Sequence, residues 1–556
     1  MNARKFSLYW HTLRHLRPVQ LWGRLHRLLV RPAVPAPERL PVRSVTGALV
    51  AWAERRPSMI GPSRFRFLND ERTAASPETW ADPAVPLLWL YNLHYFDDLA
   101  ASGATARGAW HAALIQRWLS EHPAPAKPGW DPYPTSLRIV NWIKYILAVG
   151  VPDPAIVASL AQQARWLSKD VEWHLLANHL FANAKALLFA GAFFEGPEAD
   201  RLLGAAERIL TVQLPEQVLP DGGHFERSPM YHAIILEDVL DMLNAARLWR
   251  GAVSPRLERM LDETAGRMLG AMARMCHPDG EIGFFNDSAT GIAANPGDLA
   301  AYAARLGVVA SDHSQVWPGP DVKLGGALLA DTGYARLTAP AAVAIVDVAP
   351  VGPDYQPGHA HADTLSFELS VFGSRLIVNG GTSCYGLGPD RAAERRTSAH
   401  STVSVDGQDS SEIWSGFRVA RRAYPRDLVL SGNSEEVGIA CSHDGYRRLA
   451  RDLAHRRSWR MRAQALTIED RILGEAGHSA VAQFKLHPDV TAIQTDARNF
   501  VLQLATGHEV RLIVHEGAAV LAGGHYAPEF GRRLETDCIA VQLVEGRSRV
   551  ELSWQA

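Results

Sequence analysis

The sequence is poor in cysteine, has no excess of charge of one sign and contains no long apolar run. Its four cysteines, at positions 276, 384, 441 and 538, lie far apart and form no C-x-x-C pair, so they provide neither a zinc-ribbon signature nor a disulfide framework. The formal net charge of −2 excludes the overall basic field that nucleic-acid binding needs. We therefore expect no nucleic-acid partner.

Signals for membrane insertion and export are missing as well. No apolar run reaches the roughly 18 residues that a membrane-spanning helix requires. Residues 1–32 contain neither a continuous apolar core nor a small-residue cleavage site, so they do not form a Sec signal peptide. The sequence therefore predicts no transmembrane segment and, on this ground, a cytoplasmic location.

The rest of the composition is typical of a soluble globular protein. Hydrophobic residues make up 47% and charged residues 21%, and 556 residues are too many for one hydrophobic core, so we expect two or three domains. Residues 1–60 hold eleven Arg and Lys but only two Glu, with Leu, Trp and Tyr between them. Such a segment either lies on an anionic membrane surface as an amphipathic helix or, more commonly, packs its apolar stripe on the protein body.

Hydrophobic spacing divides the chain into an arm, a helical half and a β half. Residues 1–84 form a basic N-terminal helical arm and a connector, and residues 85–310 carry at least seven amphipathic segments at helical spacing, which indicates a helix-pair array or toroid. After a linker at 311–326, residues 327–556 alternate or are β-branched between turn residues, which predicts stacked antiparallel sheets. A groove between two such domains is the usual place for a ligand.

The stretch YQPGHAHADTLSFELS at 355–370 carries polar residues in an apolar pattern. Because side chains of a strand alternate between faces, its odd positions from 359 onward would share one face. These positions are His359, His361, Asp363, Leu365, Phe367 and Leu369. Buried polar groups need partners, so the cluster suggests either a functional site or a His/Asp group that ties a loop to a strand.

Two helical segments offer further candidates. In residues 171–191 the pairs His174/Asn178 and His179/Asn183 are four apart and share faces of a predicted helix, although such an amide can also satisfy a neighbouring helix end. Ser228 and Pro229 predict an N-cap and a first helical position, which places Tyr231 in the first turn. There the helix dipole would make the phenol easier to ionise, and Arg227 would add to this effect if it turned toward the ring. Tyr231 could equally be structural.

Several long motifs in this order resemble the heparinase II/III family of bacterial polysaccharide lyases. They are LWLYNLHYFDDL (88–99), WDPYPTSLRIVNWIKY (130–145), ANHLFANAKALLFAG (177–191), DGGHFERSPMYH (221–232), HPDGEIGFFNDSATGIA (277–293) and GHAHADTLSFELS (358–370). The resemblance implies a multidomain α+β protein with an incomplete (α/α) toroid followed by an antiparallel β-sandwich. It also implies β-elimination at a uronic acid of an acidic polysaccharide, with loss of the C5 proton and the 4-linked oxygen and formation of an unsaturated uronate.

The resemblance assigns roles to particular residues. Asn178 matches the asparagine that neutralises the substrate carboxylate, Tyr231 the catalytic acid at the leaving oxygen, and His359 the catalytic histidine of the β domain. Either Tyr231 or His359 takes the C5 proton, depending on the stereochemistry of the sugar. Arg138 and Asn141 are expected to bind the acidic sugar through bidentate contacts.

His179 and Arg227 complete the expected substrate-binding set. A metal site is less well supported. His361 and His400 match zinc ligands of some relatives, and three imidazoles with a carboxylate could bind zinc. The third ligand of those relatives is an aspartate, and Asn379, a poor zinc ligand, stands in its place. We therefore expect no required cofactor, and any zinc to be structural.

Two other functions compete with the lyase. A catalytically weak glycan-binding protein that serves bacterial surface-polysaccharide assembly would keep the same fold. An (α/α)-barrel glycoside hydrolase would need a carboxylate pair across the groove, for which Glu226, Asp287 and Asp363 are the candidates, although none forms an evident pair. Degradative lyases of the family are exported, so a periplasmic location is the alternative to the cytoplasm.

Overall fold

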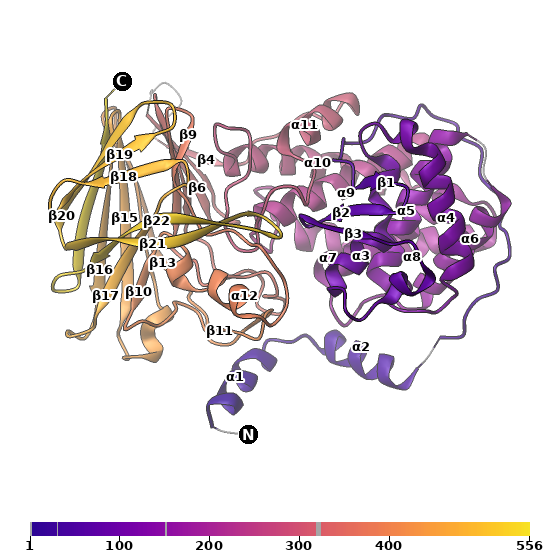
Figure 1. Cartoon of the computed structure of the whole chain (residues 1–556), viewed down its shortest axis with the longest axis horizontal. Helices are drawn as coiled ribbons and strands as arrows, with labels where there is room; N and C mark the ends of the chain where they lie inside the picture. The colour runs from indigo at the N-terminus through magenta and orange to yellow at the C-terminus, as the bar shows by residue number, and fades with distance from the viewer. Residues whose placement is uncertain (1–2, 31, 151–152, 318–323, 556) are drawn as a thin grey trace.

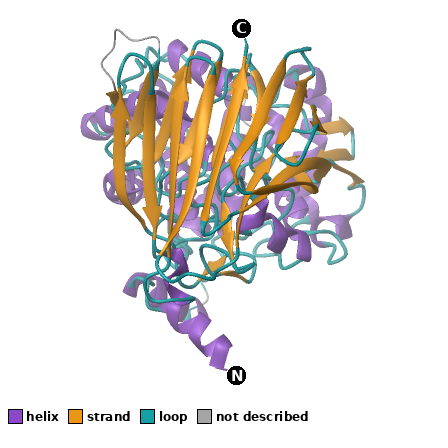
Figure 2. Ribbon diagram, turned by 90° about the vertical axis from the view of Figure 1, so that its left-hand side faces the viewer, coloured by secondary structure: helices purple, strands orange, loops and turns teal. Residues whose placement is uncertain are grey.

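The computed structural model describes residues 3–30, 32–150, 153–317 and 324–555. A helical domain and a β domain lie side by side, and the N-terminal helices α1 (Ala3–Leu13) and α2 (Pro18–Leu29) lie beneath both (Figure 1). Seen from the side of the β domain, the strands stand across the molecule with the helices behind them (Figure 2). The predicted toroid followed by an antiparallel sandwich is confirmed.

The helical domain owes its helices to apolar stripes with clear start signals. Asp153, Ser228, Ser254 and Asn295 cap four helices with side-chain oxygens, and proline follows each cap. The helices bury their stripes in one core that includes several wholly buried tryptophans. They are α3 (Leu87–Tyr95), α4 (Gly108–Glu121), α5 (Pro132–Val149), α6 (Pro154–Lys169), α7 (Ala177–Phe193), α8 (Pro197–Gln217), α9 (Pro229–Leu248), α10 (Pro255–Met275) and α11 (Pro296–Arg305).

The β domain consists of antiparallel sheets that share one core. Side chains alternate in and out along strands such as β15 (Ala454–Arg462), which is why period-two patterns predicted them. The six-stranded sheet contains β4 (Gln315–Trp317), β5 (Gly325–Leu329), β6 (Tyr334–Ala339), β7 (Ala342–Asp347), β8 (Phe367–Val371) and β9 (Ser374–Ile377) in that order.

A larger sheet of eight strands faces it across the core, and smaller sheets complete the domain. The eight strands run in the order β13 (Pro425–Gly432), β14 (Val437–His443), β15 (Ala454–Arg462), β16 (Ala465–Leu473), β23 (Arg547–Trp554), β20 (Glu509–Glu516), β19 (Asn499–Leu504) and β18 (Val490–Gln494). The four-stranded sheet contains β10 (Val403–Val405), β17 (Ala480–Lys485), β22 (Arg532–Gln542) and β21 (Ala518–Glu529). A hairpin of β11 (Ile413–Trp414) and β12 (Arg418–Val419) and the short helix α12 (Pro389–Glu394) lie at the end nearest the arm.

The predicted linker at 311–326 is partly wrong. Gln315–Trp317 forms strand β4 and pairs with β5, so the β domain begins within the predicted linker. Residues 318–323 of that linker lie outside the described residues. Strand β4 has only three residues, too few to show an alternating pattern, and the sequence around it is rich in Gly and Pro. The sequence therefore did not indicate this edge strand.

The arm and connector also differ from the prediction. A three-stranded sheet of β1 (Met59–Gly61), β2 (Arg64–Phe67) and β3 (Asp70–Thr73) stands where only a connector was expected, and it buries Phe65 and Phe67 against the helical core. The prediction that the arm packs its apolar stripe on the body is wrong, because α1 and α2 turn polar side chains inward. None of the helices in the described ranges is both long and apolar enough to cross a bilayer.

The two domains are joined by buried polar contacts. Asp221, in the loop before α9, accepts hydrogen bonds from the backbone nitrogens of Asp331 and Thr332 and from the Thr332 hydroxyl, in the turn between β5 and β6. Beyond α10, the imidazole of His277 contacts Glu368 and Ser370 of β8 at 2.8 Å each. These contacts hold the loops of both domains together at the place where the predicted site residues lie.

Candidate functional site

The predicted strand at 359–369 is mostly a loop. Strand β8 starts only at Phe367, and Leu365 has a positive φ of 62°, which breaks any regular alternation. His359, His361 and Asp363 therefore do not share a strand face. The backbone of this loop is held by the segment Asn286–Ser288 instead of by a neighbouring strand: the Asp287 nitrogen donates to the His359 carbonyl, and the Asn286 side chain accepts from the His361 nitrogen.

Tyr231 and His359 meet at the junction of the domains. Their rings are stacked with 3.8 Å between centroids and an interplanar angle of 18°. Ser228 caps α9 as predicted, since its hydroxyl accepts from the Tyr231 nitrogen, and the same hydroxyl donates to the carbonyl of Asp287. The 286–288 segment thus positions both the Tyr231 phenol and the His359 imidazole. The Tyr231 hydroxyl also lies 3.0 Å from that of Tyr385.

Glu226 orients the His359 ring. A carboxylate oxygen of the buried Glu226 contacts His359 Nδ1 in a short hydrogen bond. Burial by itself would raise the pKa of Glu226, but the His359 imidazole and this hydrogen bond lower it below the ordinary value, so the carboxylate is ionised at neutral pH. An ionised carboxylate accepts only, so Nδ1 carries the proton and Nε2 of a neutral His359 is left with a lone pair.

The expectation that Tyr231 ionises easily is wrong. Burial raises the pKa of its phenol well above 10, and the neighbouring Tyr385 adds to this. Arg227 does not help, because its guanidinium donates to the carbonyl oxygens of Thr332 and Phe225. Arg227 thus ties the α9 loop to the β domain, and the phenol of Tyr231 is neutral at physiological pH.

Asn178 presents an unused amide. It is 5% exposed, its Oδ1 is buried without a hydrogen-bond partner, and its side chain makes no hydrogen bond with any other described residue. The neighbouring Asn183, by contrast, bonds Glu172 and Ser136 with both ends of its amide. A buried amide without a partner is costly in the free protein, and a ligand would satisfy it.

The backbone before Asn178 is strained. Leu176 has φ 65° and ψ −154°, a region that is essentially restricted to glycine, and Ala177 has a φ of 49°. Helix α7 starts only at Ala177, so the predicted helix at 171–191 is wrong in its first turns and His174 does not share a face with Asn178. His174 instead contacts Arg27 of the arm.

His179 lies partly exposed beside Asn178. Its ring is 4.6 Å from the ring of Tyr133 on α5, and its Nδ1 is 3.1 Å from Glu172. Burial lowers its pKa, but the Glu172 carboxylate outweighs this and raises it above the ordinary value. The Glu226 carboxylate raises the pKa of His179 as well, by a smaller effect.

Arg138 and Asn141 are structural, so their predicted role in substrate binding is wrong. Arg138 is fully buried: its guanidinium donates to Gln163, Gly129 and Thr135 and lies over the ring of Trp118. The amide of Asn141 donates to the Tyr95 carbonyl and to Asp97. Both side chains lie on the face of α5 that packs into the helical domain. Helical spacing alone could not distinguish this face from the one toward the β domain.

His361 and His400, the two predicted metal ligands, lie together. His361 Nδ1 is 3.0 Å from His400 Nε2, while the other nitrogens of the two rings contact Asp287 and the Arg396 carbonyl. Asn379 accepts from the Ser401 nitrogen and turns its amide nitrogen to Ser366, away from both imidazoles. Within the described ranges no three His, Cys, Asp or Glu side chains are grouped as metal ligands.

The three carboxylates considered for a hydrolase are all engaged. Asp287 is wholly buried, and Arg391 and His361 hold its pKa below the ordinary value against the effect of burial. Asp363 accepts from the Asn286 nitrogen, and Glu226 holds His359. These contacts do not leave the free acid and base pair that glycoside hydrolysis needs.

Sequence reasoning missed two contributors to the site. Glu226 was considered only as a hydrolase carboxylate, although it orients His359. Tyr385, in the segment after β9, was not singled out, yet it contacts Tyr231 and stacks over His359 at 6.2 Å. Glu226 comes from the helical domain, 133 positions before His359, and Tyr385 lies in an irregular segment of the β domain; no spacing rule joins either of them to His359.

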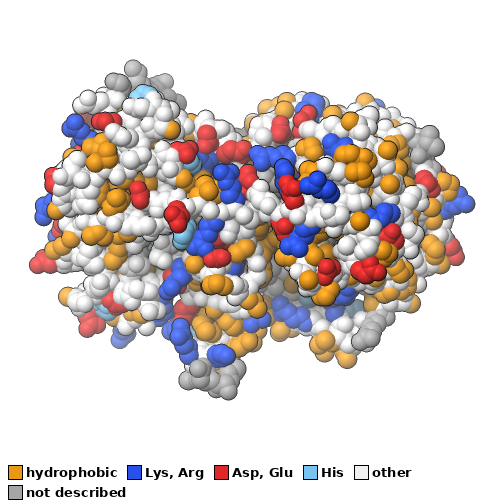
Figure 3. All heavy atoms as spheres, viewed as in Figure 1, with side chains coloured by type: hydrophobic (Ala, Val, Ile, Leu, Met, Phe, Trp, Pro, Cys, Tyr) orange, Lys and Arg blue, Asp and Glu red, His pale blue; other side chains and the backbone are white. Residues whose placement is uncertain are grey.

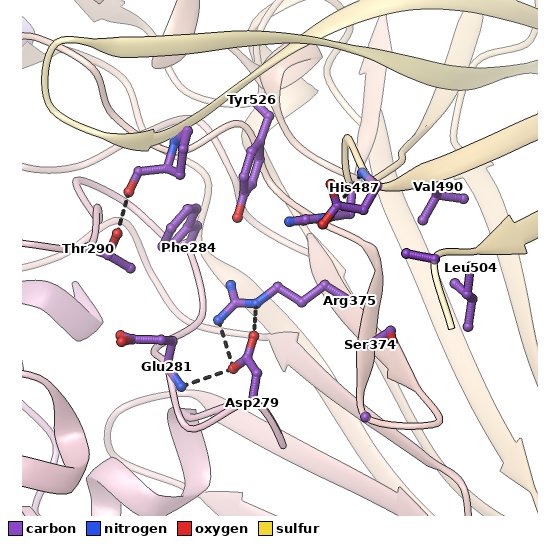
Figure 4. Close-up of a pocket in the computed structure, with 14 residues that line it drawn as sticks. Asp279, Glu281, Phe284, Thr290, Ser374, Arg375, His487, Val490, Leu504 and Tyr526 are labelled. Carbon is purple, nitrogen blue, oxygen red and sulfur yellow. Dashed lines mark hydrogen bonds and ion pairs between the residues drawn. The ribbon is translucent and has the colours of Figure 1, made fainter. Parts of the chain in front are cut away.

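A separate pocket of about 310 Å³ opens on the β domain and contains none of the predicted site residues (Figure 4). Arg375 crosses its floor and forms two hydrogen bonds with Asp279. Phe284 and Tyr526 stack beside it at 5.5 Å. Arg375 ties the segment beyond α10 to β9, so this pocket belongs to the junction of the domains and not to the Tyr231–His359 pair.

A helical toroid, a β-sandwich and a phenol–imidazole pair where they meet define a protein of the toroid-and-sandwich class. Residues 128–300 match the model of the heparinase II/III N-terminus, and residues 322–555 match the heparinase II/III-like C-terminal model. The chain belongs to the heparinase II/III family.

Relatives of this chain carry two kinds of name. It is 30% identical over 453 residues to FtsZ-localized protein C of Caulobacter vibrioides, covering 74% of this chain and 72% of that protein. It is 26% identical over 266 residues to heparin-sulfate lyase of Pedobacter heparinus, covering 45% of this chain and 39% of the lyase. The crystal structure of heparinase III superimposes with a TM-score of 0.69 at 17% identity, over 98% of this chain and 90% of that one, which shows a shared fold.

Proposed function

We propose that the protein is a polysaccharide lyase that cleaves a uronic-acid-containing acidic polysaccharide by β-elimination. The observation that carries the proposal is the stack of Tyr231 on His359, with Glu226 on the far nitrogen of the imidazole. The stack places a neutral phenol, which can act as an acid, in direct contact with an oriented imidazole, which can act as a base. Membership of the heparinase II/III family supports the same chemistry.

Each step uses side chains of the site. The Asn178 amide donates to the uronate carboxylate and stabilises the charge that develops there when C5 loses its proton. His359 Nε2 accepts that proton, the electron pair of the C5–H bond forms the C4–C5 double bond, and the C4–O4 bond breaks. Tyr231 donates its proton to O4, and the Tyr385 hydroxyl at 3.0 Å can return a proton to the phenolate. His179 adds positive charge for the acidic polymer.

The stack also restricts the stereochemistry. No sugar fits between two rings that are 3.8 Å apart, so Tyr231 and His359 must reach the substrate from the same side. This geometry favours uronates whose C5 hydrogen and C4 oxygen lie on one face of the ring, as in D-glucuronate and D-mannuronate. Their C5 epimers, L-iduronate and L-guluronate, present the two groups on opposite faces.

A glycan-binding protein for surface-polysaccharide assembly is the second candidate. The relative named FtsZ-localized protein C favours it, because that name gives a place in the cell and no reaction. This candidate predicts affinity for an acidic polysaccharide without formation of a double bond.

A panel of uronate polymers separates the candidates. We expect near-ultraviolet absorbance to rise with glucuronate or mannuronate polymers, to be absent with polyguluronate, and to fall at least about 100-fold in Tyr231→Phe. Tyr424→Phe, which removes a phenol oxygen that bonds Asp354 outside the site, is the matched control. Reducing ends without absorbance would indicate a hydrolase, and binding without either would indicate the assembly role.

A further inference from the structure

The outer face of the N-terminal arm (α1 and α2) is apolar over its whole length. On α1 the exposed side chains Phe6, Trp10 and Leu13 follow one another at helical spacing, with 61%, 61% and 52% of their surface exposed. A second apolar stripe at helical spacing runs along α2, and each of its side chains is at least 47% exposed. It consists of Leu21, Trp22, Leu25, Leu28 and Leu29. Single exposed apolar residues are ordinary, but eight on two consecutive helices form a patch that marks an interaction site.

The inner face of the same helices is mostly polar or small, with Tyr9 against Trp414 as its aromatic contact. Thr12 donates to the Val419 carbonyl, Gln20 is fully buried and donates to the Tyr355 carbonyl, and Gly23 fits closely against His174. Arg27 reaches Asp170 at 3.1 Å. An amphipathic helix of a globular protein normally turns its apolar stripe to the body. The arm instead turns its polar side to the body. Its apolar stripe is therefore exposed and available to another partner.

The charge of the arm indicates what that partner is. Residues 3–30 contain six Arg and Lys and no Asp or Glu, and the first acidic residue of the chain is Glu38. Arg17 and Arg27 pair with Glu216 and Asp170 of the helical domain. Arg14 and Arg24 are exposed and, at helical spacing, flank the two apolar stripes. The arm lies at the lower edge of the molecule (Figures 1 and 3), and its apolar stripes are exposed.

We propose that the arm docks the protein on the surface of an anionic lipid bilayer. Both helices lie in the interface, with the Leu, Phe and Trp side chains in the boundary between headgroups and acyl chains and the arginines at lipid phosphates. A second copy of the chain is a poorer occupant, since it would bring two cationic arms together. An acidic polysaccharide would match the charge but would leave the Leu side chains in water.

Docking would also set the position of the candidate site. Arm helix α2 contacts Tyr355 and His174, which stand four residues before His359 and Asn178, respectively. The site would therefore lie close to the bilayer surface, facing glycans that are held there. This inference does not rest on lyase activity, because the arm contacts none of the reacting groups.

Vesicle sedimentation of the full chain tests the proposal. We expect the protein to sediment with vesicles that contain phosphatidylglycerol, to stay in solution with pure phosphatidylcholine vesicles, and to be released by salt. Leu25→Glu/Leu28→Glu should weaken binding at least about tenfold, because two buried Leu contacts are replaced by anions. Arg14→Gln/Arg24→Gln should weaken it and reduce its salt dependence.

The matched control is Val309→Glu/Val520→Glu, which places the same two charges at exposed valines outside the arm and should bind like the unmodified protein. Melting temperatures of all variants check that the fold is intact. The proposal is overturned if no vesicle retains the protein, or if Leu25→Glu/Leu28→Glu binds unchanged. A dimer that dissociates in this variant, without vesicle binding, would identify a second copy as the occupant.

Discussion

At the scale of single residues, the site depends on which groups are left without an internal partner. Asn178 keeps an unused amide, whereas Asn141 and Asn183 spend theirs on neighbouring groups. Burial keeps the Tyr231 phenol protonated, and the Glu226 carboxylate fixes the orientation of the His359 ring. Residues of the same types elsewhere in the chain bond internal groups. The hydrogen-bond partners of a side chain, and not its residue type, therefore decide whether it is free to meet a ligand.

Glu226→Gln tests the orienting role of this carboxylate. The amide keeps the size of the side chain but no longer stabilises the imidazolium or fixes Nδ1–H, so we expect the turnover rate to fall about 10- to 100-fold with little change in KM. The melting temperature should stay unchanged, whereas a purely structural role of Glu226 would lower it.

Arg391→Met tests the buried ion pair behind the site. Arg391 and Asp287 are both wholly buried, so removing the cation leaves an uncompensated carboxylate and should lower the free energy of unfolding by about 3–5 kcal/mol. Arg396→Met is the control, because Arg396 is 52% exposed and its pair with Asp409 should be worth at most about 1 kcal/mol. Urea unfolding measures both, and equal losses would contradict the argument.

At the scale of elements, helix starts and loops decide where the reacting groups lie. Helix α7 begins with two residues in left-handed backbone immediately before Asn178, and α9 begins with the Ser228 cap three residues before Tyr231. The 358–366 loop is held by side chains of the 286–288 segment. Strain and caps at these places fix side-chain directions that a regular helix or strand would not allow.

Ala177→Gly measures the strain at the start of α7. Ala177 has a φ of 49°, a conformation that glycine adopts without penalty, so the relief should offset the lost methyl and keep stability within about 0.5 kcal/mol of the unmodified protein. Ala184→Gly, equally buried but in the middle of α7, should cost about 1–2 kcal/mol. Similar losses in urea unfolding for both variants would show that Ala177 is unstrained.

At the scale of the whole molecule, the site exists only while the two domains keep their relative position. Tyr231 comes from the helical domain and His359 from the β domain, and the Asp221–Thr332 clasp holds the intervening loops. The arm adds contacts to both domains, with Thr12 on the β12 side and Arg27 on α6 and its following loop.

Gly223→Ala should disturb this arrangement. A Cβ at Gly223 would lie 1.8 Å from the Thr332 hydroxyl oxygen, so the loop before α9 must move away from the β domain and carry Glu226 with it. We expect activity to fall at least about tenfold, since displacements near 1 Å at a reacting centre have large effects. Far-ultraviolet circular dichroism should be unchanged. Gly108→Ala, where the added Cβ meets nothing within 4 Å, should keep full activity.

Local pattern was sufficient for much of the architecture. Apolar spacing of 3.6 and of 2 placed the helical and β halves, and Ser228-Pro229 placed the start of α9, because these signals act over a few neighbouring residues. Long motifs identified the family and proposed Asn178, Tyr231 and His359 as site residues, of which Tyr231 and His359 are in contact in the structure. The same local logic failed at 359–369, where alternation predicted a strand but side chains from another segment hold a loop.

The sequence by itself determined the two-domain plan, the family and the residue types of the site. Only the tertiary structure decided that Arg138 and Asn141 bond internal groups, that Arg227 ties the α9 loop to the β domain, that Glu226 and Tyr385 belong beside the stacked rings, and that the arm turns its apolar stripe outward. The physical reason is that burial, partner and orientation are set by contacts between segments far apart in the chain. A one-dimensional pattern records which face of an element is apolar, but not what the tertiary structure places against it.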